Sequence, residues 1–183
     1  AEGGMRDAES ALDQLMAFRG RDIREADVLA VFGLVSRSSM EDLAGAVLKG
    51  DVQTMIRLLS TADRDGKDMQ RMMYELIEYF KNLLIIRYVG DEEVDLDLTG
   101  AQKTVLRAQG EGIHPDRVLR IVEILTESEG RLRYALSRRT LVETALIRCA
   151  RAATVVTLEE ILGQLNALKN VMGIADGDGK KKK

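Results

Sequence analysis

The segment that most constrains the fold is residues 67–89, which have the pattern of the longest helix in the sequence. Such a helix would be about 33 Å long at the standard helical rise. Its second half, residues 76–86, is apolar almost all the way round. A helix of this kind has to be surrounded by other elements, so we predict that it forms the core of a helical bundle. Met69, Met72 and Met73 allow two interpretations, an adaptable binding surface or pliable core filling, of which core filling is favoured.

The composition favours helices over strands. The sequence of 183 residues contains one proline and no tryptophan, and it is rich in Ala, Leu, Glu and Arg, which have good helix propensity. Apolar residues make up 45% of the chain, enough for a core at this length. We therefore predict an all-α protein, a bundle of about seven to nine helices.

The charge and the cysteine content restrict the functional classes. A net charge of −3 and a pI near 5.4 give no overall attraction to nucleic acid, so such binding would need a local patch. The single cysteine, Cys149, cannot form an internal disulfide, which fits a reducing cytoplasm. The sequence has no membrane-length apolar run and no signal-peptide pattern, so we expect a cytoplasmic protein without a membrane partner. It begins without Met and within a motif, so we expect a piece of a longer chain.

Capping residues divide the middle of the chain into helices. Ser38, with Glu41 three residues later, has the pattern of a capping box and predicts a helix that continues to about Lys49. Gly50 is expected to end this helix and Asp51 to cap the next one.

A second pair of helices is predicted further along. A short helix is expected from Thr99 to about Gln109, broken by Gly110 and Gly112. Pro115 suits the first position of the following helix. The predicted buried face of that helix consists of Val118, Ile121, Val122 and Leu125, resumed by Leu132 and Leu136.

No catalytic or metal-binding pattern stands out in the sequence. The acidic segment 90–97 could bind a hard cation or be a solvated loop; its residues are out of register with the calcium-loop pattern, which favours the loop. His114, the only histidine, has no zinc-ligand partners and no nearby nucleophile, so we expect a structural role. We predict that this chain is not catalytic by itself.

The opening stretch, residues 3–16, reads Gly-Gly-Met-Arg-Asp-Ala-Glu-Ser-Ala-Leu-Asp-Gln-Leu-Met. Arg6 lies one turn into the predicted helix, where the helix dipole favours anions. On spacing alone, Arg6 is either a solvated residue paired with Glu2 or Glu9, or a phosphate ligand. The apolar stripe of this helix, which excludes Arg6, consists of Met5, Ala8, Leu12 and Leu15.

This stretch closely resembles the Gly-Ser-Met-Arg-Asp-Ala…Leu-Asp-Gln segment of the bacterial DNA polymerase III gamma/tau subunit, the motor of the sliding-clamp loader. Gly4 stands where that family has serine. The resemblance implies that the segment is the last helix of the lid domain of an AAA+ ATPase. It also implies that Arg6 is the "sensor 2" arginine, which touches the terminal phosphates of the nucleotide.

The stretch from Arg139 to Arg148 carries a second part of the resemblance. Family members commonly have an arginine, then an apolar–Glu pair, then an apolar–Leu–basic ending; here the matching positions include Arg139, Glu143 and Arg148. The resemblance implies that these three residues lie on the last helix of the oligomerisation domain, at the subunit interface. The alternative for Arg139 and Glu143 is an ordinary surface pair four residues apart on one helix, and the interface is the favoured interpretation. Cys149 is expected to be a small buried residue.

The resemblance also implies a domain organisation. Residues 1–20 would be the end of the lid domain, residues 21–172 the helical collar domain (domain III), and residues 173–183 a disordered tail or the start of a linker. Within the collar, residues 158–172 show a heptad rhythm. This helix is predicted either to dock on the bundle or to protrude.

The implied function is subunit assembly in DNA replication. The collar would hold the ATP-driven ring that loads the sliding clamp onto primed DNA. Its direct partners would be copies of itself and the delta and delta-prime subunits, with the clamp and DNA contacted only through the full complex. The chain would hold no cofactor; ATP and Mg²⁺ would belong to the parent protein, an ATPase subunit of the polymerase holoenzyme. Arg6 would sense nucleotide only beside that ATPase domain.

The alternative is a helical nucleic-acid-binding domain. Arginines outnumber acids in residues 117–151, and such a patch could follow phosphates. The acids are interspersed and aromatic residues are scarce, which favours a mixed-charge surface or an interface. The arginines are Arg117, Arg120, Arg131, Arg133, Arg138, Arg139, Arg148 and Arg151.

Overall fold

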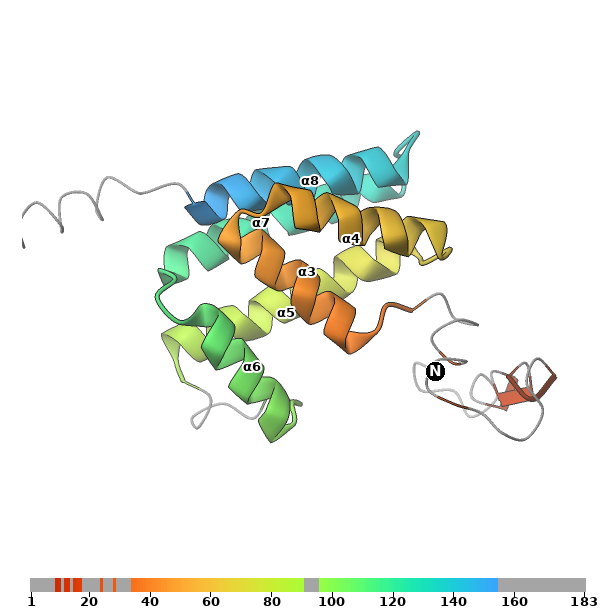
Figure 1. The fold of residues 1–183 in the computed structure, drawn as a ribbon, viewed down its shortest axis with the longest axis horizontal. Helices are drawn as coiled ribbons and strands as arrows, with labels where there is room; N and C mark the ends of the chain where they lie inside the picture. The colour runs from red at the N-terminus through yellow and green to blue at the C-terminus, as the bar shows by residue number, and fades with distance from the viewer. Residues whose placement is uncertain are drawn as a thin grey trace, which may run out of the picture. The chain divides into compact units, whose positions relative to one another are not determined.

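The computed structural model describes residues 34–90 and 96–154, with isolated positions between residues 9 and 28. These ranges contain only helices and their connections, which confirms the predicted all-α fold. Arg6, most of the acidic segment 90–97, the heptad helix and the tail lie outside the described residues. The helices are α3 (Arg37–Lys49), α4 (Val52–Arg64), α5 (Met69–Tyr88), α6 (Gly100–Gly110), α7 (Pro115–Leu132) and α8 (Arg138–Thr154) (Figure 1).

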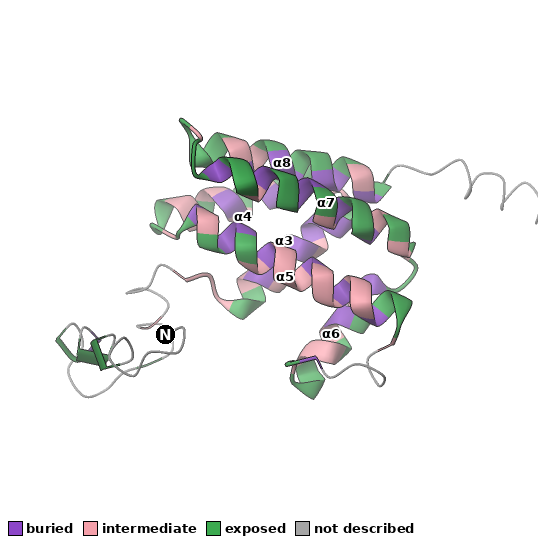
Figure 2. Ribbon diagram, turned by 180° about the vertical axis from the view of Figure 1, so that it is seen from behind, coloured by how far each residue is buried: buried purple, intermediate pink, exposed green. Residues whose placement is uncertain are grey.

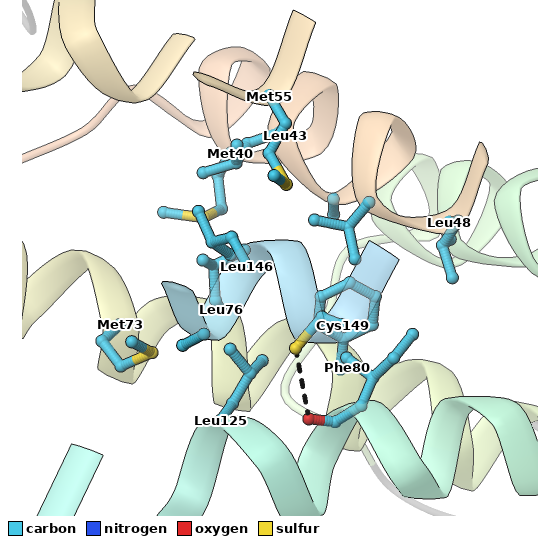
Figure 3. Packing of buried hydrophobic residues seen from close by; sticks show 14 of the residues in the cluster. Met40, Leu43, Leu48, Met55, Met73, Leu76, Phe80, Leu125, Leu146 and Cys149 are labelled. Carbon is cyan, nitrogen blue, oxygen red and sulfur yellow. Dashed lines mark hydrogen bonds between the residues drawn. The ribbon is translucent and has the colours of Figure 1, made fainter. Parts of the chain in front are cut away.

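Helix α5 is the centre of the bundle, as its apolar pattern predicts. It packs most extensively against α7, and also contacts α6 and α3. Leu76 and Phe80 on α5 are completely buried, and Figure 3 shows them among Leu125 of α7 and Leu146 of α8. The predicted core role of the methionines is confirmed, because all three are buried: Met69, Met72 and Met73.

The caps around α3 confirm two predictions and correct one. Gly50 ends α3 with a positive φ of 68°, and the Asp51 side chain accepts the Thr54 N–H at 3.0 Å to start α4. The predicted cap at Ser38 is wrong. The extended backbone of Ser36 places its hydroxyl 3.2 Å from the Ser39 N–H, so the helix begins earlier and includes Ser38.

The start of α7 also follows its sequence signals. Pro115 occupies the first turn, and His114 Nδ1 accepts the Asp116 N–H at 3.3 Å. This contact confirms the structural role predicted for His114, because the imidazole replaces the usual hydroxyl or carboxylate of an N-cap.

One prediction about a helix end is confirmed and one is wrong. Helix α6 ends at Gly110, within one residue of the predicted end, and Gly112 beyond it has a positive φ of 73°; Gly110 is buried and packs so closely on α5 that a Cβ there would meet Leu83. Leu136 does not resume the buried face of α7. The helix ends at Leu132, where the Tyr134 N–H bonds to the Arg131 carbonyl, and the chain turns so that Leu136 is fully exposed.

One more residue of α7 differs from its predicted burial. Val122, predicted to be buried, is only half-buried at the edge of the core.

No helix in the two described ranges has the length and the apolar character needed to cross a membrane.

Candidate subunit interface

The side chain of Arg139 joins α8 to α4. Its Nε donates to Glu143 Oε1 at 2.9 Å within α8, as the spacing predicts. Its Nη1 donates to Asp63 Oδ2 at 2.8 Å, and its Nη2 donates to Ser60 Oγ at 3.1 Å. The hydrogen bonds that the guanidinium donates to the carboxylates of Glu143 and Asp63 raise its pKa. Arg139 is therefore fixed by its own protomer, with about half of its side chain exposed.

The side chain of Arg148 bonds to a residue of another helix, α7. Its Nη2 donates to Glu127 Oε2 at 2.9 Å, joining α8 to α7. The Arg131 Nη1 lies 3.6 Å from the other carboxylate oxygen of Glu127. The hydrogen bond from Arg148 lowers the pKa of Glu127. Arg139, Glu143 and Arg148 thus belong to two separate ion-pair clusters on α8, which we call the Arg139 and Arg148 clamps.

A groove of about 400 Å³ lies between α3, α5 and α6, and we call it the apolar groove. Two hydrogen bonds link the three helices beside it: Tyr79 Oη donates to Gln109 Oε1 at 3.0 Å, and Gln109 Nε2 donates to the Glu41 carbonyl at 3.0 Å. Burial, with the nearby charge of Glu41, raises the pKa of Tyr79. The apolar and aromatic lining consists of Val35, Met40, Tyr74, Tyr79, Leu98 and Leu106.

The charged residues of the apolar groove are nearly balanced, and two of its three glutamates are paired. Three glutamates line it against two arginines. The Arg71 Nε pairs with Glu75 at 3.1 Å, and the Lys81 Nζ pairs with Glu78 at 2.5 Å. The charged lining residues are Arg37, Glu41, Arg71, Glu75 and Glu78.

The connection between α7 and α8, residues 133–137, projects from the end of this helix pair, and we call it the tip. It exposes two large apolar or aromatic side chains, Tyr134 at 84% and Leu136 at 109% of their full surface. Figure 2 shows this loop as exposed, on the opposite side of the described bundle from α6. The sequence did not single out the tip, because its leucine matched the spacing of a buried face.

Most arginines of the basic segment 117–151 are engaged within the protein. Arg120 pairs with Glu123 at 2.8 Å, and the Arg117 Nη1 donates to the Ala153 carbonyl at 3.1 Å. Together with the pairs of Arg131, Arg139 and Arg148 described above, these contacts favour the mixed-charge surface over a patch that follows phosphates.

The part of the chain that the structure describes contains no group of three His, Cys, Asp or Glu residues that could hold a metal ion. Cys149 is completely buried, as predicted, and its Sγ lies 3.8 Å from the Ile121 carbonyl (Figure 3). Burial raises the pKa of this thiol to about 12, so it stays protonated near neutral pH.

Comparison with known proteins identifies the family. The family described as DNA polymerase III subunits gamma and tau domain III matches residues 23–165. The chain belongs to this family. The tau subunit of Bacillus subtilis is 27% identical over 153 residues, which cover 84% of this chain. The gamma/tau subunit of Mycobacterium tuberculosis is 26% identical over 153 residues, covering 81% of this chain.

The family assignment confirms the resemblance seen in residues 139–148, which lie within the matched region. Arg6 lies outside both the matched region and the described residues, so its nucleotide-sensing role stays a prediction. The chain spans only 27% of the length of the Bacillus subtilis relative and 26% of the Mycobacterium tuberculosis relative.

Proposed function

We propose that this chain is the subunit-assembly (collar) domain of a DNA polymerase III gamma/tau protein. In DNA replication it would hold together the ATP-driven ring that loads the sliding clamp onto primed DNA. The match of the domain III family to residues 23–165 is the observation that carries this proposal. The named relatives, subunits of DNA polymerase III, support the same context.

The surface of the described bundle suits protein contacts better than chemistry. It combines a groove lined by apolar and aromatic side chains with a loop that exposes Tyr134 and Leu136. Interfaces draw their stability from such apolar contacts and from paired polar groups around them. The half-exposed Arg139 and Arg148 clamps are candidates for the polar part, because each retains surface that a partner can reach.

The partners in this proposal are copies of the same domain and the delta and delta-prime subunits. The clamp and primed DNA would be reached only through the full complex. ATP and Mg²⁺ would bind the ATPase domain of the parent protein, where Arg6 would meet the terminal phosphates.

Assembly can be tested with the purified 183-residue chain. Sedimentation velocity should show concentration-dependent self-association, or binding when delta and delta-prime subunits are added. A chain that stays monomeric at high concentration and binds neither subunit would contradict the collar assignment. Binding to DNA that weakens steeply with salt would instead support the nucleic-acid alternative.

The proposal also expects no detectable ATP hydrolysis by this chain alone. Robust hydrolysis that an Arg6→Ala substitution abolishes would contradict it, because it would mean that these residues contain a complete nucleotide site.

A further inference from the structure

We propose that the tip and a hollow beside it bind an acidic protein segment that carries an apolar side chain. The hollow has a volume of about 400 Å³ and lies between the end of α7 and the start of α8; we call it the tip cleft. It is separate from the apolar groove, whose walls are α3, α5 and α6. The inference goes beyond subunit assembly, because it gives the domain a further binding site.

Much of the lining of the tip cleft is apolar. Ala145 is buried and Leu141 is half-buried in this lining, and Ala135 and Leu136 complete its apolar part. Leu136 is fully exposed, so a partner that covers it removes a large apolar side chain from water. The volume of the cleft is within the range of pre-formed binding pockets. An aliphatic side chain of a partner therefore fits this site.

The hydroxyl groups in the lining are already hydrogen-bonded within the protein. Ser128 Oγ donates to the Ile124 carbonyl at 2.7 Å, and Thr144 Oγ1 donates to the Thr140 carbonyl at 2.9 Å. The hydroxyls of Ser137 and Thr140 lie 2.9 Å apart and bond to each other. An apolar side chain can therefore enter the cleft without leaving these groups unpaired, which would otherwise be costly.

Arginines surround the apolar part of the cleft. Arg131 and Arg148 belong to its lining, and both hold the carboxylate of Glu127, at 3.6 and 2.9 Å. Arg133 and Arg138 are exposed, and neither makes a hydrogen bond or an ion pair within the described residues. These two guanidinium groups remain available for carboxylates of a partner.

The positive charge of this region remains after its ion pairs are counted. Three carboxylates pair with the arginines of residues 131–148, those of Asp63, Glu127 and Glu143. Glu129, another acid near the end of α7, lines a different hollow together with Arg71 of α5. Five arginines against three carboxylates leave an excess of two positive charges, so the partner segment should be acidic. The arginines are Arg131, Arg133, Arg138, Arg139 and Arg148.

A nucleic-acid strand matches this site less well than a protein segment. Its phosphates would suit the arginines, but the described residues that line the tip cleft include no aromatic ring on which a base could stack. Tyr134, the exposed aromatic residue of the tip, is outside this lining. An aliphatic side chain flanked by carboxylates matches both the apolar lining and the arginines.

The site is formed before a partner arrives. The tip is short, since α7 ends at Leu132 and α8 begins at Arg138, and Figure 2 shows it exposed at the end of this helix pair. Two backbone hydrogen bonds brace it: the Tyr134 N–H donates to the Arg131 carbonyl at 3.2 Å, and the Ala135 N–H donates to the Leu132 carbonyl at 3.3 Å. Little conformational freedom therefore has to be lost on binding.

The experiment uses the full 183-residue chain and a fluorescein-labelled probe peptide, Gly-Glu-Asp-Leu-Glu-Asp-Leu-Glu. One control peptide has serine in place of both leucines, and a second has the amides Gln and Asn in place of the acids. Fluorescence anisotropy measures binding at low and at physiological salt. We expect the probe to bind, more weakly as salt rises, and each control peptide to bind about fivefold more weakly than the probe or less.

Variants of the chain test the residues. The charge variant carries Arg133→Gln with Arg138→Gln, and the cleft variant carries Leu136→Ser; all three positions are exposed, so the fold is preserved. The matched control carries Leu119→Ser with Arg120→Gln, at exposed positions of α7 outside the tip cleft. Circular dichroism and thermal unfolding establish that the variants fold like the parent chain. The charge and cleft variants should each bind the probe about fivefold more weakly or less, and the control variant should bind it as the parent does.

Four results would overturn the inference. The first is a parent chain that does not bind the probe, and the second is binding that the charge variant or the cleft variant retains in full. The third is equal binding of the serine peptide, which would mean a simple attraction between charges. The fourth is an oligothymidylate strand that binds more tightly than the probe and is lost in the same variants, which would make the tip a nucleic-acid contact. Subunit assembly is measured separately, so failure of the probe would leave the collar proposal standing.

Discussion

Replacing Gly110 by alanine is expected to destabilise the protein, although alanine is normally the better helix residue. A Cβ atom at this position would lie 2.7 Å from Leu83 Cδ1 and 3.1 Å from Arg87 Cδ. Carbon atoms in ordinary contact are about 3.5–4.0 Å apart. Leu83 is completely buried, so it cannot move away without disturbing its neighbours.

The magnitude follows from two opposing effects. Overpacking a core typically costs about 1–3 kcal/mol, while replacing glycine by alanine within a helix contributes about 0.5–1 kcal/mol. We expect Gly110→Ala to lower the free energy of unfolding by about 1–2 kcal/mol. Leu83→Ala alone should lower it by about 2–5 kcal/mol, because a fully buried leucine leaves a cavity.

Combining the two substitutions should reverse the sign of the Gly110 effect. With the Leu83 side chain shortened, the new methyl group at position 110 would occupy part of the vacated space. In that background Gly110→Ala should stabilise the protein, giving a coupling energy of about 2 kcal/mol between the two sites. Urea unfolding followed by circular dichroism measures all four proteins of the cycle.

Gly130 provides the control, because it lies within α7 and a Cβ there would meet nothing within 4 Å. Gly130→Ala should raise the free energy of unfolding by about 0.5–1 kcal/mol. If Gly110→Ala stabilised the protein as Gly130→Ala does, or if the coupling were below about 0.5 kcal/mol, the close packing of α6 on α5 would be refuted.

Three further predictions concern single side chains. Cys149 should not react with thiol reagents at about pH 8 until denaturant unfolds the chain; rapid labelling of the native protein would contradict its burial. Glu127→Gln should lower the urea midpoint of unfolding near neutral pH, because the hydrogen bond from Arg148 needs the carboxylate. This difference from the parent should disappear as the pH falls through the lowered pKa of Glu127. A difference that persisted in acid would contradict this account. His114→Ala should cost about 0.5–2 kcal/mol by removing the cap of α7, and His114→Asn should recover most of it; equal losses in both variants would argue against capping.

The sequence predicted those parts of the fold that depend on neighbouring residues. The apolar pattern of residues 67–89 located the central helix within two residues at its start and one at its end, because a buried helix repeats its pattern over several turns. Gly50, Asp51 and Pro115 marked helix boundaries correctly, since each acts through its own backbone or the next few residues.

The errors and omissions arise from contacts that join distant segments. Gly110 ends α6 as its identity predicts, but its close packing against Leu83 on another helix had no local signal in the sequence. Asp63 is 76 residues away from Arg139, so nothing near either residue indicated their ion pair. The groove escaped prediction for the same reason, since three helices that are separate in the sequence form its walls.

The tip lies between Leu132, the last core residue of α7, and Val142, the first core residue of α8. Substitutions within it therefore leave the interior unchanged. If the proposed assembly uses this loop, a change confined to it would alter which neighbour the domain prefers and leave the scaffold intact.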